Sequence, residues 1–143
     1  MPKLVLKSDV AVAPDLLWQS IRRFSAIAAW NPLVRDLQAD GDTVGSVREL
    51  ELEGAGHFVE RLEELDDGAR LYSYSVVASP FSVENCIVQV RVEDRGDNTS
   101  TVEWTSTFES QTQTEFKTVR SFQQIYQSAL DNIAKQFSDD NKP

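Results

Sequence analysis

The sequence has one cysteine and one histidine, and it lacks a continuous apolar run long enough to span a membrane. Cys86 cannot form an intramolecular disulfide, which is typical of a reducing compartment, so we expect a cytoplasmic protein. A lone histidine also argues against a zinc site, because zinc usually takes three or four nitrogen or sulfur ligands. We therefore expect no metal, no other cofactor and no stable membrane insertion.

Positive charge is also scarce. Fourteen basic residues stand against 23 acidic ones, which gives a formal net charge of −9. A phosphate backbone would be repelled by such a surface, so nucleic acid is disfavoured as a partner. A length of 143 residues predicts a single domain over 1–143, with a solvated tail at 138–143. A monomer and a homodimer are both compatible with this composition.

The N-terminal quarter of the chain predicts one strand followed by two short helices. Apolar and polar residues alternate over 3–12, with an expected irregularity near Ser8. Pro14 and Asp15 then favour a helix start, and this helix is expected to end near 23. A second helical piece at 25–29 is stopped before Pro32, because the residue preceding a proline is pushed out of helical geometry.

The rest of the chain predicts an antiparallel meander and a long helix. Turn signals separate six expected strands, at about 33–39, 45–53, 57–65, 69–77, 83–93 and 100–109. After 114 the apolar spacing changes to steps of three and four, which indicates an amphipathic helix of about six turns. The fold class is therefore α+β, with a curved seven-stranded antiparallel sheet wrapped around the last helix.

Several segments carry a resemblance to a known family. They are VAPDLLWQSIRRFSAIAAWNPLV at 12–34, VGSVRELEL at 44–52, HFVERLEELDD at 57–67, LYSYSVV at 71–77 and STVEWTSTF at 100–108. In this order, followed by the closing helix, they resemble the polyketide cyclase/dehydrase branch of the START-like, helix-grip superfamily. The resemblance implies a helix-grip fold with a cavity for a small apolar or aromatic molecule. It implies no single reaction, because members act as cyclases, as carriers or as helpers in quinone biosynthesis.

Two charged residues are expected to face the interior. Side chains two residues apart on a strand lie on the same face, so Arg48 lies on the face of Leu50 and Leu52. By the same argument Glu60 lies on the face of Phe58 on the next strand. A hairpin closing at 54–56 would place Glu60 opposite Leu50 and diagonal to Arg48. The pair then either holds a polar group of a ligand or is a structural ion pair at the cavity rim.

The two tyrosines and the histidine on these strands are less constrained by the pattern. Tyr72 and Tyr74 alternate with Leu71, Ser73 and Ser75, and either set could point inward if a bulge shifts the register. If the tyrosines face inward, Tyr74 offers a phenolic donor to a ligand; otherwise both are surface-strand residues favoured by β-propensity. His57 starts its strand on the face opposite Glu60, so we expect it in solvent, where it is a poor candidate for a general base.

The remaining cavity candidates are mostly apolar. Trp30 is either an aromatic residue at the cavity mouth or a structural wedge. The other candidates lie on the face of their strand or helix that is expected to point inward, where they either line the cavity or simply fill the core. The predicted cavity residues are Trp30, Arg48, Leu50, Phe58, Glu60, Tyr74, Val88, Val90, Trp104, Phe116, Val119, Phe122, Gln123 and Tyr126. Catalytic residues are not assigned.

Three functions remain open at this stage. The first is binding of a small hydrophobic or aromatic ligand. The second is an aromatase/cyclase or dehydratase, in which Arg48 would stabilise an enolate while Glu60 or Tyr74 moved protons. The third is a protein-interaction module without a small-molecule ligand, which would show a filled core and an exposed apolar patch.

Overall fold

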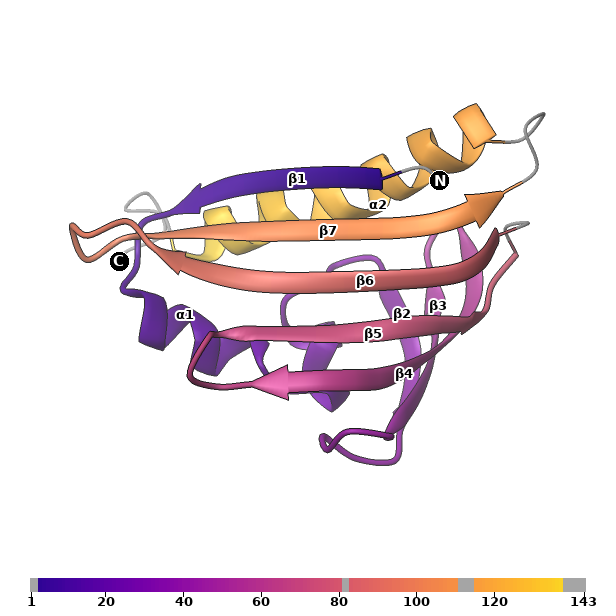
Figure 1. Cartoon of the computed structure of the whole chain (residues 1–143), viewed down its shortest axis with the longest axis horizontal. Coiled ribbons are helices and arrows are strands. Elements are labelled where there is room, and N and C mark those ends of the chain that lie inside the picture. The colour runs from indigo at the N-terminus through magenta and orange to yellow at the C-terminus, as the bar shows by residue number, and fades with distance from the viewer. Residues whose placement is uncertain (1–2, 81–82, 111–114, 138–143) are drawn as a thin grey trace.

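A computed structural model describes residues 3–80, 83–110 and 115–137. Seven antiparallel strands form one sheet in the order β1-β7-β6-β5-β4-β3-β2, as the meander predicted (Figure 1). The strands are β1 (Lys3–Val10), β2 (Val34–Ala39), β3 (Val47–Leu52), β4 (Gly56–Asp66), β5 (Leu71–Ala78), β6 (Val83–Asp94) and β7 (Ser100–Ser110). The expected irregularity near Ser8 is absent, because β1 pairs with β7 in continuous register from Lys3 to Val10.

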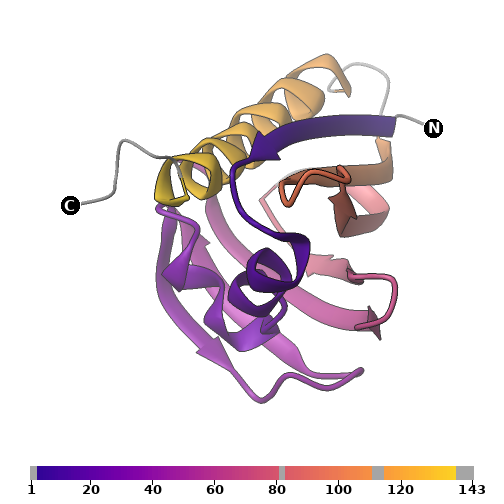
Figure 2. The ribbon, with the colours of Figure 1, turned by 90° about the vertical axis from the view of Figure 1, so that its left-hand side faces the viewer.

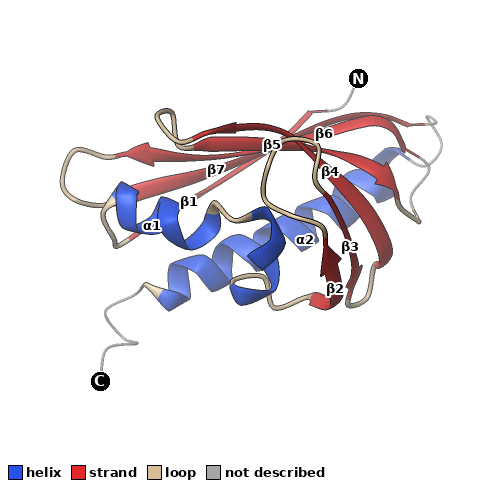
Figure 3. Cartoon of the chain, turned by 90° about the horizontal axis from the view of Figure 1, so that it is seen from below, coloured by secondary structure: helices blue, strands red, loops and turns tan. Residues whose placement is uncertain are grey.

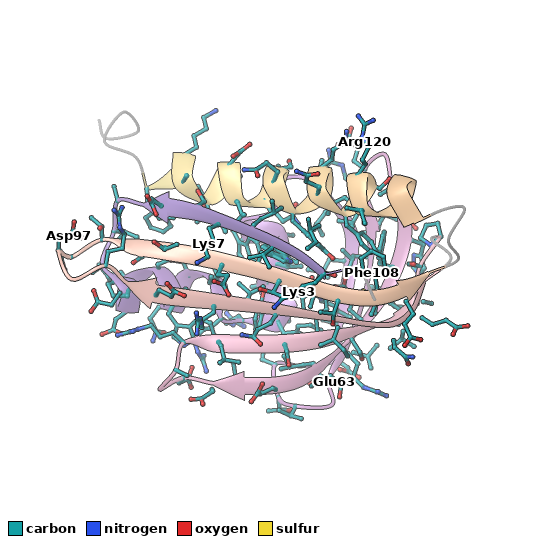
Figure 4. All side chains as sticks on the ribbon, turned by 45° about the horizontal axis from the view of Figure 1, so that its top comes forward. Lys3, Lys7, Glu63, Asp97, Phe108 and Arg120 are labelled. Atoms are coloured by element: carbon teal, nitrogen blue, oxygen red, sulfur yellow. The ribbon has the colours of Figure 1, made fainter. Side chains whose placement is uncertain are left out.

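The helices lie on one side of the sheet, which curves around them (Figures 2 and 3). They are α1 (Pro14–Ile21), the 3-10 helix η1 (Phe24–Ala29) and α2 (Glu115–Gln136). Trp18 Nε1 and Arg22 both donate to the carboxylate of Asp67, which ties α1 to the β4–β5 turn. Charged side chains such as Lys3, Lys7 and Glu63 point away from the space between the sheet and α2 (Figure 4).

The register between β3 and β4 differs from the prediction by two residues. Arg48 lies directly opposite Glu60, and Leu50 lies opposite Phe58. The prediction placed Gly56 in the turn, whereas Gly56 pairs with Leu52 as the first residue of β4. The turn therefore spans 53–55 instead of 54–56, and this shift of its centre by one residue moves every cross-strand partner by two positions.

The cross-strand neighbours decide the orientation of the tyrosines. Tyr74 lies opposite Leu62 of β4, and on the other side Tyr72 and Tyr74 lie opposite Val90 and Val88 of β6 in continuous register. Both tyrosines share the inward face of these buried neighbours and are 0% and 2% exposed. The inward alternative for Tyr72 and Tyr74 is thus the one that the structure adopts.

Gly56 is held where a side chain has little room. Its φ is 108°, and a Cβ built on it would lie 2.7 Å from Cγ of Pro80, in the turn after β5. We expect Gly56→Ala to lower the free energy of unfolding by about 1–3 kcal/mol through strain and this collision. Gly54→Ala is the control, because Gly54 also has a positive φ, 80°, but a Cβ there meets no atom within 4 Å. Equal losses in urea unfolding would contradict the role of Pro80.

Candidate functional site

A closed hollow lies between the concave face of the sheet, η1 and α2. Seven of the predicted cavity residues line it, namely Leu50, Phe58, Glu60, Tyr74, Trp104, Phe122 and Tyr126. The prediction missed five further lining residues, namely Ile27, Asn31, Leu52, Val76 and Ile125. Two of these five were predictable. Leu52 is two residues from Leu50 and so lies on the same face of its strand, and Ile125 is three residues from Phe122 and so lies on the same face of its helix.

The hollow is small in this conformation. The centre of a water molecule has about 20 Å³ in which to move, and a cavity needs roughly 10–15 Å³ by that measure to hold one water. An aromatic molecule therefore enters only if lining side chains change rotamer or α2 shifts. The sequence predicts a cavity for a small apolar or aromatic molecule, and in this conformation the space at that place has room for about one water molecule.

Arg48 and Glu60 form an ion pair inside the protein. Arg48 Nε donates to Glu60 Oε1 at 2.8 Å, and the two side chains are 0% and 6% exposed. Arg48 Nη1 also donates to the carbonyl oxygen of Phe24 at 2.9 Å. Glu60 lines the hollow, so its carboxylate is a charged group at the wall, and Arg48 stands behind it.

Aromatic rings surround the guanidinium of Arg48. Its central carbon lies 4.0 Å from the centre of the Phe24 ring and 4.7 Å from that of Tyr74, which are cation–π distances. Burial lowers the pKa of Arg48, but Glu60 and the two tyrosines outweigh it and leave that pKa above its ordinary value. Arg48 is therefore charged at every physiological pH. Its Nη2 has no hydrogen-bond partner among the described residues.

A stack of aromatic rings forms the opposite wall. Trp104 stacks on Tyr126 with ring centres 5.1 Å apart, and Tyr126 stacks on Phe122 at 5.7 Å. Trp30 packs edge-on against Trp104 at 5.6 Å. The indole nitrogens of Trp30 and Trp104 are buried and have no hydrogen-bond partner in the described part of the chain. Because Trp104 lines the hollow and Trp30 lies behind it, this wall combines flat apolar surface with one indole N–H donor that has no acceptor in the described part of the chain.

The phenols at the hollow act as donors. Burial raises the pKa of Tyr74 well above its ordinary value, with a further contribution from Glu60. Burial likewise raises the pKa of Tyr126, whose hydroxyl donates to Ser106 Oγ at 3.4 Å. Neither Tyr74 nor Tyr126 can therefore take a proton from a substrate near neutral pH. Burial also raises the pKa of the Cys86 thiol to about 11, so this thiol is a poor nucleophile.

The other predicted cavity residues lie outside the walls of the hollow. Trp30, Val88 and Val90 are buried core residues, and Val119 packs half-buried against the core. Gln123 was wrongly predicted, because its side chain is exposed. The buried face of α2 runs through Phe122, Ile125, Tyr126 and Ala129, and position 123 is turned about 100° from 122. The side chain of Phe116 lies outside the described residues.

His57 lies on the outer face of the sheet, as expected. Its Nδ1 is 2.9 Å from Glu51 Oε1 and its Nε2 is 3.3 Å from Glu49 Oε1. Glu51 and then Glu49 raise the pKa of His57 above its ordinary value of 6.5. Any stabilisation by these contacts is therefore complete below about pH 6.5 and is lost as the pH rises through the folded-state pKa.

We expect an NMR titration of the His57 ring to show a midpoint above 6.5. Glu51→Gln should lower this midpoint, because Glu51 is the stronger contact. Glu53→Gln is the control, because Glu53 pairs with Arg35 instead. A midpoint at or below 6.5 in the unmodified protein would refute the assignment.

Comparisons with known proteins agree with this fold. A family model described as polyketide cyclase/dehydrase and lipid transport matches residues 1–138. The solved structure of XoxI from Bacillus cereus is 27% identical, covers 100% of both chains and superposes with a TM-score of 0.89. The search of curated proteins gave no match. Among the described residues, no helix is long and apolar enough to cross a membrane.

Two further solved structures share the fold. One is an uncharacterised protein from Bacillus thuringiensis, which is 26% identical over 95% of this chain and 98% of its own, with a TM-score of 0.86. The other is a protein from Thermobifida fusca, which is 29% identical over 96% of this chain and 93% of its own, with a TM-score of 0.84. The similarity thus extends over nearly the whole length of each chain.

Proposed function

Because the chain belongs to the polyketide cyclase/dehydrase and lipid transport family, we propose that it binds a small hydrophobic or aromatic molecule in the hollow between the sheet and α2. The observation that carries the proposal is the composition of the walls. They are apolar and aromatic apart from a few polar groups, which is the usual make-up of a small-molecule site. The single buried cysteine supports a cytoplasmic location for this activity.

The polar groups indicate the chemistry of the ligand. Trp104 lines the hollow and its indole N–H has no acceptor among the described residues. Tyr74 and Tyr126 remain protonated and also line it. A carbonyl or hydroxyl oxygen on a flat ligand would accept a hydrogen bond from such donors, and the ring would stack on Trp104 or Tyr126. A ligand carboxylate is disfavoured at the wall by Glu60.

Native mass spectrometry of the protein purified from its own host tests this proposal. We expect a bound small molecule of defined mass that is released on denaturation and then identified. Val76→Trp should abolish it, because Val76 lines the hollow and an indole there would fill it. Val77→Trp is the matched control, because this neighbouring side chain is 56% exposed and lies outside the walls of the hollow.

A clean apo mass, with no thermal shift across a library of aromatic and acyl compounds, would overturn the binding proposal. The interaction-module alternative would then gain weight. The exposed large apolar side chains in the described chain come from separate segments, namely Val5, Leu16, Val44, Val77 and Ile87. Only Val77 and Ile87 are seen to share a surface depression, on the outer face of β5 and β6, so the described residues give that alternative a small apolar area.

The enzymatic alternative is favoured by one observation, which is that Glu60 lines the hollow together with Tyr74 and Tyr126. In a dehydration, Glu60 would take the proton from the carbon next to a ketone and return it to the leaving β-hydroxyl, which departs as water. A protonated tyrosine would stabilise the enolate oxygen. An aromatic β-hydroxyketone is a suitable probe, because its conjugated product absorbs in the ultraviolet. Glu60→Gln should then bind the probe without converting it.

A further inference from the structure

Asn31 is a polar residue in the wall of the hollow to which the proposed function assigns no role. It lies between η1 and β2, and its side chain lines the hollow although the residue is 3% exposed. Its backbone N–H donates to the carbonyl oxygen of Ile27 at 2.9 Å, and its own carbonyl oxygen accepts from the N–H of Val34 at 3.2 Å. The backbone of Asn31 is therefore held on both sides.

The amide of Asn31 is oriented by the turn that follows it. Oδ1 accepts a hydrogen bond from the backbone N–H of Leu33 at 3.1 Å, which identifies this atom as the amide oxygen. The other amide atom, Nδ2, carries two N–H groups and has no hydrogen-bond partner among the described residues. Because Oδ1 is engaged in the turn, Nδ2 is the polar group that Asn31 can offer to the hollow. A buried donor without an acceptor costs free energy, and a ligand acceptor would recover it.

Two further groups at the walls of the hollow have free hydrogen-bonding capacity. Glu60 accepts from Arg48 through Oε1, and its Oε2 has no hydrogen-bond partner in the described part of the chain. The hydroxyl of Tyr74 forms no hydrogen bond within that part either. Burial raises the pKa of Tyr74, so this hydroxyl keeps its proton. The hollow thus offers an amide that only donates, a carboxylate oxygen that accepts and a hydroxyl that can do both.

This combination matches a hydroxyl group better than any other polar group of a ligand. A hydroxyl oxygen can accept from Asn31 while its proton is donated to Glu60. A ketone or ether oxygen would satisfy Asn31 but would face the carboxylate without a proton between them. An ammonium group would face the amide donor, and Arg48 already balances the charge of Glu60. The space, about 20 Å³ for the centre of a water molecule, has room for one such oxygen.

We propose that Asn31, Glu60 and Tyr74 form a subsite for one hydroxyl group of a neutral aromatic ligand, and that Asn31 determines the specificity for this group. The ring that carries the hydroxyl lies against Trp104 and Tyr126 when the hollow opens. The inference rests on the proposed function, because it needs a ligand in the hollow. It adds the polar group that the ligand presents and the residue that recognises it.

Phenol and fluorobenzene test this subsite, because they are similar in size and only phenol can donate a hydrogen bond. We expect phenol to bind the unmodified protein about tenfold more tightly in isothermal titration calorimetry, since it forms hydrogen bonds with groups that otherwise have no partner. Anisole, whose oxygen accepts but cannot donate, should bind no more tightly than fluorobenzene. Phenol that binds no more tightly than either of the other two would overturn the hydroxyl subsite.

Asn31→Ser should remove most of this preference. Serine keeps an oxygen that can accept from the N–H of Leu33, but it has no amide nitrogen and its side chain is one atom shorter. We expect the ratio of the phenol and fluorobenzene affinities to fall from about ten to about two. Asn132→Ser is the matched control, because the amide of Asn132 donates to the carbonyl oxygen of Trp30 and lies outside the hollow. An equal fall in both variants would overturn the role of Asn31.

Tyr74→Phe is a second variant that leaves the turn at Asn31 intact. Phenylalanine keeps the ring that packs on Arg48 at 4.7 Å and removes the hydroxyl. We expect the phenol preference to fall about threefold. Tyr72→Phe is the control, because the hydroxyl of Tyr72 has no partner among the described residues and does not line the hollow. An unchanged preference in Tyr74→Phe would overturn the three-residue subsite.

These outcomes are distinct from a failure of the binding proposal. Circular dichroism and urea unfolding establish that each variant is folded. If phenol and fluorobenzene bind with equal affinity, the hollow is a binding site and the hydroxyl subsite is wrong. If neither molecule binds the unmodified protein or any variant, the binding proposal fails and the subsite fails with it.

Discussion

Glu60→Leu should be among the most destabilising single substitutions in this protein, lowering the free energy of unfolding by about 3–5 kcal/mol. Arg48 is fully buried, and its Nε donates to Glu60 at 2.8 Å. Without Glu60 the guanidinium remains charged, because it has no route to deprotonation at physiological pH. The cost is therefore that of an uncompensated buried cation, and urea unfolding followed by tryptophan fluorescence measures it.

An exposed ion pair on the same strand provides the control. Arg61 Nε donates to Glu63 at 2.9 Å, but these side chains are 51% and 36% exposed. Glu63→Leu should therefore change stability by only about 0–1 kcal/mol. The double variant Arg48→Met/Glu60→Leu should recover most of the loss, because an apolar pair of similar volume carries no desolvation cost. A double variant no more stable than Glu60→Leu would contradict this explanation.

The stability of the double variant also bears on why the Arg48–Glu60 ion pair is present. If an apolar pair is equally stable, the ion pair is not needed for folding, and its place at the wall of the hollow is better explained by what it does for a ligand. Arg48 orients Glu60 through its Nε, while Phe24 and Tyr74 hold Arg48 in place. The arrangement is a positioned carboxylate in a largely apolar wall.

The inward orientation of Arg48 and Glu60 was predictable because it depends only on the two-residue period of a strand. Arg48 has to share the face of Leu50 and Leu52 whatever lies across from it. The partner across the strand depends on the turn instead. If Gly56 belongs to the turn, Glu60 is a diagonal neighbour of Arg48. Because Gly56 is instead the first residue of β4, Glu60 lies directly opposite Arg48.

The features that were not predictable depend on several elements at once. Whether Tyr72 and Tyr74 faced inward depended on their pairing with Leu62 of β4 and with Val88 and Val90 of β6, which no local signal in β5 marks. The exposure of Gln123 depended on the rotation of α2 about its axis, which its contacts with β1 and β7 set. The size of the hollow depends on the rotamers of twelve lining residues together, so composition alone could predict the walls but not the volume.

Phe122→Ala should have the second large effect, lowering the free energy of unfolding by about 3–5 kcal/mol. Phe122 is 1% exposed; it packs edge-on against Phe108 and stacks on Tyr126. Its removal costs the transfer energy of the ring and leaves a larger cavity. Gln123→Ala is the control in the next position, and we expect a change within about 0.5 kcal/mol because Gln123 is exposed. Equal losses would mean that α2 is rotated from its described position.

The same variant tests whether the closed hollow is the site that opens for a ligand. Apolar cavities of about 150 Å³ stay dry and bind benzene, and Phe122→Ala should enlarge the hollow in that direction. Benzene at ten times its dissociation constant would then raise the stability of the variant by about 1.4 kcal/mol. The unmodified protein should gain less, because benzene must first displace Phe122 or Ile125 from their closed positions. If benzene stabilises neither protein, the neighbouring side chains collapse into the space, and the hollow is core packing instead of a binding site.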